Sequence, residues 1–151
     1  MIKYDGATSE MYAFFWEAWK LGAPPIVGYL PEIRWMGVPF RELPPSSQFW
    51  ARASIQTMGT QQATLSTCEG APYQRKYNTY GLVVIQVFCP RSDTQAAEKG
   101  RQLAMVAQEA FQGRATENKI WFRKVRITEL PPEELYERFN IIGEFNYDTI
   151  K

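Results

Sequence analysis

The stretch 73–90 constrains the fold of this chain more than any other part of it. Between residues 79 and 89 both alternating sets of side chains are mostly apolar, β-branched or aromatic. Such a run is typical of a β-strand at the centre of a sheet, and it predicts cover on both faces. Pro90 ends the strand, and Ser92-Asp93 then offers a cap for a helix.

A first helix is predicted over residues 8–21 by apolar side chains at helical spacing. This apolar face consists of Met11, Phe14, Phe15, Ala18 and Leu21. Trp16 and Trp19 fall off that stripe, and we interpret them as a second contact surface. A broad buried face of the helix is the alternative interpretation.

A second helix is predicted over residues 93–112, where small residues would allow close approach to a sheet, with Gly113 as its stop. Clean alternation predicts a strand over 49–58, with Phe49, Ala51, Ala53, Ile55 and Thr57 facing the core and Trp50 facing outward. A weaker strand is predicted over 61–66, and a short extended piece around 33–38.

Two further strands are predicted near the end of the chain, over 119–129 and 135–147, joined by a short polar connection and therefore antiparallel. In the first, Trp121, Val125 and Ile127 share one face, opposite Phe122. In the second, the apolar set is Leu135, Phe139, Ile141, Phe145 and Tyr147.

The order helix, strands, helix, strands predicts an α+β fold, with two helices packed on one face of a mainly antiparallel sheet. The 151 residues are interpreted as a single domain, 1–151. Two long irregular excursions interrupt it, at about 23–48, which holds six of the ten prolines, and at 59–76, which is polar. Long loops of this kind usually carry function or wrap a surface.

The sequence predicts no enzyme chemistry. It contains no histidine, so Ser-His and Cys-His pairs are absent, and no glycine-rich phosphate loop is present. Glu133-Glu134 lies in a proline turn, where a solvated pair is expected. We therefore predict no catalytic residue, no cofactor and no metal, since two cysteines do not make a zinc site. Cys89 is expected to be a buried free thiol; Cys68 is left open.

Composition bears on partners as well. The formal charge of +1 gives no basic excess of the kind that marks a free nucleic-acid-binding domain, so sequence-specific nucleic-acid binding is not expected. The start resembles no signal peptide, and no apolar run reaches the ~20 residues of a membrane span. A soluble protein made in the cytoplasm is expected. The aromatic content of 15% favours protein interfaces.

The ordered set of features resembles the tail terminator proteins of long-tailed bacteriophages, over about residues 11–148. The segment 33–40, followed by Pro44-Pro45 and the 49–52 strand start, is similar to that family's proline-bounded entry into its first long strand. The 75–90 strand with its Ala-rich helix is similar to the central unit, and 136–148 to the last strand. The 131–134 turn departs from the family, where a glycine-bearing turn is expected.

This resemblance implies a structural protein of the virion, at the junction of head and tail. It implies a ring, of six chains, that caps the tail tube, ends tube polymerisation and contacts the head connector or head completion protein. DNA passing through the ring lumen is compatible with this role. A ring needs two different patches on each chain. Our candidate interface residues are Trp16, Trp19, Arg52, Gln61, Gln62, Tyr73, Arg75, Lys76 and Tyr77.

Two alternatives stay open at this point. One is another head–tail joining or tail tube component with the same core, which would extend a tube rather than cap it. The other is a small α+β ligand-binding domain or enzyme, which a deep pocket with convergent polar groups would favour.

Overall fold

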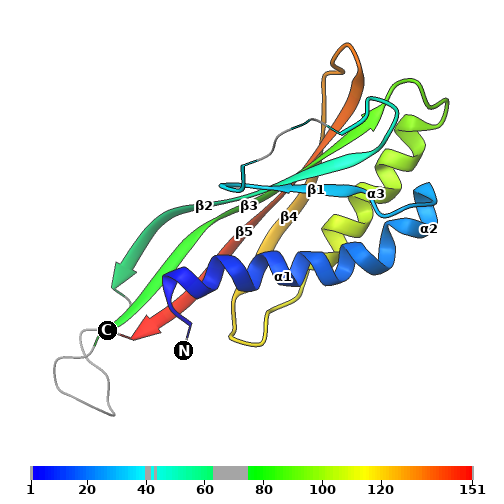
Figure 1. Cartoon of the computed structure of the whole chain (residues 1–151). Helices are drawn as coiled ribbons and strands as arrows, with labels where there is room; N and C mark the ends of the chain where they lie inside the picture. The colour runs from blue at the N-terminus through cyan, green and yellow to red at the C-terminus, as the bar shows by residue number, and fades with distance from the viewer. Residues whose placement is uncertain (1, 40–41, 43, 63–74, 151) are drawn as a thin grey trace.

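The computed structural model describes residues 2–39, 42, 44–62 and 75–150. One five-stranded sheet, in the order β1-β2-β3-β5-β4, carries helices on one of its faces (Figure 1). The elements along the chain are α1 (Tyr4–Gly22), α2 (Pro24–Val27), β1 (Glu32–Trp35), β2 (Trp50–Gln62), β3 (Lys76–Pro90), α3 (Ala96–Phe111), β4 (Trp121–Leu130) and β5 (Tyr136–Ile150).

The sheet is antiparallel except at its first strand. β1 pairs with β2 in parallel, and the other three pairings are antiparallel. A parallel pair cannot be joined by a tight hairpin, and fourteen residues separate the end of β1 at Trp35 from the start of β2 at Trp50. The α+β fold with helices on one face is therefore confirmed.

The strand that organises the fold is central, as predicted. β3 pairs with β5 along its whole length and with β2 from Tyr77 to Phe88. Its inward residues Val83, Ile85 and Val87 are buried on the side that carries the helices. The predicted cover of its second face is wrong for most of the strand. Leu82 and Val84 are only half-buried, because no described element packs on that face.

The face of α1 that enters the core differs from the predicted one. Its buried residues recur every four positions: Ala7, Met11, Phe15 and Trp19. Leu21, predicted to face the core, is 79% exposed. The helix is apolar on several sides, so its sequence alone leaves the choice of buried stripe open.

α3 lies close to the sheet because it carries small residues where it crosses. A Cβ atom on Gly100 would come within 2.5 Å of the Cys89 sulfur, which is buried and free as predicted. The helix begins at Ala96, later than predicted. Asp93 instead accepts a hydrogen bond from the Gln95 amide at 2.8 Å and pairs with Lys99 at 3.1 Å, and both hold its pKa below the ordinary value.

The predicted core faces of β2 and β5 are largely confirmed. The buried residues are Ala51, Ala53 and Ile55 in the first, with Phe49 just before it, and Phe139, Ile141, Phe145 and Tyr147 in the second. Leu135 is exposed, because it lies before β5 begins. Residues 61 and 62 extend β2 and form no separate strand; the rest of the predicted 61–66 strand lies outside the described residues.

The facing predicted for β4 is wrong at its start. A bulge between Arg123 and Arg126, with Lys124 at φ 52°, inserts an extra residue. Phe122 is therefore buried on the same side as Val125, while Trp121 is 55% exposed on the opposite side. Strict alternation cannot anticipate such an insertion.

Candidate interaction surface

An apolar groove runs between α1 and the edge strand β1. Two hollows of about 270 and 330 Å³ share Trp16 and Trp35 as walls. Tyr12 and Ala13 complete the first hollow, and the chain from Leu30 to Ile33 completes the second. We call this surface the tryptophan groove.

The groove is held by aromatic contacts with the core beneath it. The ring of Trp35 lies 4.8 Å from that of Tyr12, 6.3 Å from that of Phe15 and 6.4 Å from that of Trp16. Burial raises the pKa of the Tyr12 phenol. Phe15, which is fully buried, holds Trp35 in place, and Trp35 in turn contacts Trp16, so the hollows are preformed.

Trp19 does not belong to this surface, which corrects its prediction as an interface residue. It is fully buried, and its indole N–H donates to the Pro31 carbonyl at 3.0 Å. Trp19 therefore holds the chain at Pro31, just before β1, from within the core. Of the predicted tryptophan pair, only Trp16 is half-exposed and lines the groove.

The polar candidates gather at a second place, where β2 ends and β3 begins. Gln62 pairs with Tyr77 across the two strands, and Lys76 forms an ion pair with Asp148 at 3.2 Å. Arg75 precedes β3 and is half-buried. Tyr73 lies outside the described residues.

Gln61, opposite Asn78, is exposed. This end of the sheet lies beside the beginning of α1 (Figure 1), whereas the groove is lined by residues of α1, of β1 and of the chain before β1. The predicted site residues therefore divide between separate surfaces.

Arg52 occupies a third place, on the sheet face opposite the described helices. Its guanidinium lies 5.7 Å from the ring centre of Trp50 and 5.4 Å from that of Phe88, and these two rings stack at 4.0 Å. Trp50 thus faces outward as predicted, yet it is only 4% exposed because Phe88, Arg52 and Tyr136 surround it. Cation–π contacts of this kind stabilise the local surface.

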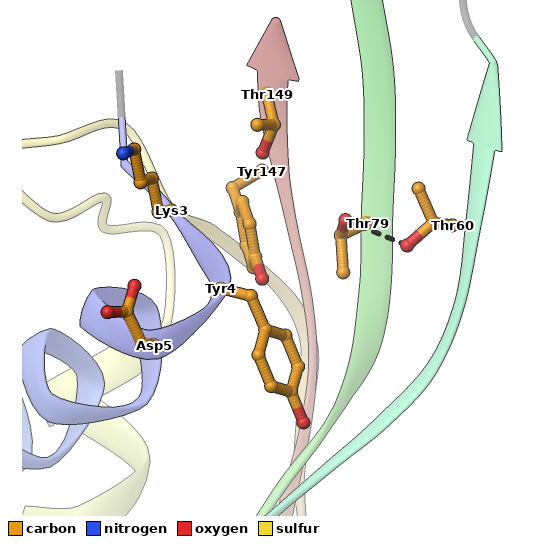
Figure 2. Close-up of a pocket in the computed structure, with 7 residues that line it drawn as sticks. All are labelled: Lys3, Tyr4, Asp5, Thr60, Thr79, Tyr147 and Thr149. Atoms are coloured by element: carbon orange, nitrogen blue, oxygen red, sulfur yellow. Dashed lines mark hydrogen bonds between the residues drawn. The ribbon is translucent and has the colours of Figure 1, made fainter. Parts of the chain in front are cut away.

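The sequence missed a pocket of about 530 Å³ between the start of α1 and the strand ends. Figure 2 shows its lining residues, which are Lys3, Tyr4, Asp5, Thr60, Thr79, Tyr147 and Thr149. The Thr60 and Thr79 hydroxyls lie 3.1 Å apart. Burial raises the pKa of Tyr147. Polar residues at inward strand positions, such as Thr79, are the signal that could have found it.

The chemistry of the described residues is limited. Within them, no group of three or more His, Cys, Asp or Glu side chains could hold a metal ion. Burial, together with the nearby Glu137 charge, raises the pKa of Cys89 to about 12, so its thiol is unreactive near neutral pH. None of the helices in this part of the chain is long and apolar enough to cross a membrane.

Comparison with known proteins adds the fold alone. No protein-family model matches the chain, and no curated protein matches it. Nine chains of known structure do match. One of them, whose name indicates no function, has 15% sequence identity and a TM-score of 0.51, and the match covers 89% of this chain and 94% of that chain.

Proposed function

We propose that this protein is a structural ring protein of the tail-terminator type. In this role, six copies close into a ring on the end of a phage tail tube. The ring stops tube growth and presents a surface to the head connector or head completion protein. The activity is one of shape and surface recognition, at the head–tail junction of the virion.

The observation that carries this proposal is the tryptophan groove. Half-exposed Trp16 and Trp35 form preformed apolar hollows at the edge of a sheet. Exposed aromatic surface of this kind is typical of protein–protein contacts, where tryptophan and tyrosine are enriched. The sequence resemblance to tail terminators supplies the ring as the assembly that would cover it.

A second observation supports the assembly role. Gln61, Gln62 and Lys76 lie where β2 ends and β3 begins, and none of the three lines the groove. A ring in a tail needs contacts to copies of itself and, separately, to neighbours above and below. Separate surfaces on one small domain meet that requirement.

The test is a mass measurement in solution by light scattering, with negative-stain imaging, alone and with polymerising tail tube subunits. We expect a ring with an open lumen, and tubes that stop growing when the protein is added. A protein that remains monomeric at every concentration and also beside tail tubes would contradict the proposal. A protein that itself extends tubes would identify a tube component.

The pocket in Figure 2 favours a second candidate, a small ligand-binding domain. Hydroxyl groups of Thr60, Thr79 and Tyr147 converge there and could hydrogen-bond a small polar molecule. A thermal-shift screen with sugars, polyols and small carboxylates tests this candidate. A saturable stabilisation that Thr79→Val abolishes would support it, and Thr128→Val, at an exposed position on β4, serves as the control.

A further inference from the structure

The two outer strands of the sheet are different from each other. Among the described residues, β1 and β4 each have a single hydrogen-bonded neighbour strand. β1 has four residues and β4 has ten. A sheet edge offers unpaired backbone groups that can pair with another chain. Two unlike edges suit a head-to-tail contact between copies.

The strand directions are compatible with such a contact. β1 runs parallel to β2, and each later neighbour in the sheet reverses direction, so β4 runs opposite to β1. In a closed ring every copy has the same orientation relative to the axis. β4 of one copy would therefore lie antiparallel to β1 of the next, like most pairs within the sheet.

We propose that the ring closes by sheet extension, in which β4 of one copy pairs with β1 of the next copy. The surface formed by α3 and β4 of the first copy then fills the tryptophan groove of the next copy. This inference rests on the proposed ring and names the surfaces that form it. The partner is a second copy of this chain.

The available length of β4 matches β1. Residues 114–116 lie beside the beginning of β4: the Phe122 amide donates to the Arg114 carbonyl at 3.4 Å, and Ala115 bridges to Trp121. The bulge then ends at Arg126. The regular part, from Arg126 to Leu130, remains for a strand as short as β1.

The helix side of the β4 edge carries the side chains that would enter the groove. Arg101 of α3 pairs with Glu129 at 3.0 Å, and Gln108 donates to the Val125 carbonyl at 3.3 Å, so this stripe of α3 faces β4. Met105 lies between them on the same stripe and is 51% exposed. A flexible thioether side chain suits an aromatic hollow.

The β4 edge carries an excess of positive charge, and acidic side chains are exposed beside the groove. β4 exposes Arg123, Lys124 and Arg126. The β1 edge exposes Glu32, which pairs with Arg34 at 3.3 Å, and α1 beside the groove exposes Glu17, which pairs with Lys20 at 3.0 Å. The side chains of Glu32 and Glu17 are 53% and 68% exposed, so both can also meet a positive charge on a second copy. Opposite charges across an interface favour the correct partner and orientation.

The experiment uses one variant on each side of the contact. Trp16→Glu places a charge in the groove, and Met105→Glu places a charge on the α3–β4 surface that would enter the groove. Ala13→Arg, at an exposed groove position, repeats the groove test without touching the core. Leu21→Glu, at the 79% exposed position on the same helix, is the matched control. Light scattering gives the mass, and circular dichroism checks that each variant is folded.

We expect rings from the wild type and from Leu21→Glu, and at least a tenfold loss of assembly in each of the other variants. Mixed Trp16→Glu and Met105→Glu should give dimers and no rings, because one intact contact remains per pair. Rings formed by Ala13→Arg and Met105→Glu at wild-type concentrations would overturn this inference and leave the proposed function standing. A wild type that never assembles, even beside tail tubes, would instead overturn the proposed function.

Discussion

The burial of Trp19 yields a quantitative prediction. Its side chain has no exposed surface, and its indole N–H satisfies the Pro31 carbonyl at 3.0 Å. Truncating a buried tryptophan to alanine costs about 3–5 kcal/mol. We therefore expect Trp19→Ala to lower the free energy of unfolding by that amount, and the melting temperature by about 6–20 °C for a domain of this size.

A milder variant separates the two contributions. Trp19→Phe keeps most of the apolar volume but leaves the buried Pro31 carbonyl without its donor, which costs about 1–3 kcal/mol. Trp16→Ala is the matched control, because Trp16 is on the same helix and only half-buried. It should lower the free energy of unfolding by less than half as much as Trp19→Ala.

The assay is urea unfolding followed by far-UV circular dichroism, which does not depend on tryptophan emission. A Trp19→Ala variant within about 1 kcal/mol of the wild type would refute the assignment of Trp19 to the core, given the cost of truncating such residues. A Trp16→Ala variant destabilised as strongly as Trp19→Ala would show that the groove wall belongs to the core as well.

Three further predictions concern the sheet. Gly81→Ala should lower the free energy of unfolding by about 1–3 kcal/mol, because its Cβ would clash with the backbone oxygen of Gln56 in β2. The shift of the urea midpoint measures this loss. Phe139→Asp should yield insoluble or unfolded protein, because it buries an unpaired charge. The control Asn146→Asp, on the opposite face of β5, should fold. A soluble, folded Phe139→Asp variant would contradict the facing of β5. In a Cys68→Ser background, Cys89 should resist thiol reagents until the protein is unfolded. The raised pKa of Cys89 favours the neutral thiol in the folded state. The contribution of this thiol to stability is therefore complete below pH 9.0 and is lost as the pH rises from there to about 12. Urea unfolding at several pH values, compared with Cys89→Ala, would detect this loss.

The strands were predictable because side-chain alternation is a local property. The inward residues of β3 and β5 follow a period of two with β-branched or aromatic side chains, and the structure buries them as expected. The same rule fails at β4, where the bulge at Lys124 shifts the alternation by one residue. A bulge depends on how a strand fits its neighbour, so it leaves little trace in the sequence of the strand itself.

The candidate site was only partly predictable. Gln62 and Tyr77 come together because β2 and β3, which follow one another in the chain, pair antiparallel, whereas the sequence predicted an irregular excursion over 59–76. The tryptophan groove depends on Trp35, from a proline-rich stretch with no clear period, lying beside Trp16. That contact arises only when β1 takes its place at the edge of the sheet.

By itself, the sequence determined the α+β order of elements, the central place of β3 and the burial of Cys89, because period, turn residues and apolar runs are encoded locally. Only the tertiary structure decided which stripe of α1 is buried, and so which of Trp16 and Trp19 stays accessible. A helix that is apolar on several sides can pack in more than one rotation about its axis. The surfaces of α3, β1 and the sheet select one of them, and those surfaces exist only once distant segments have met.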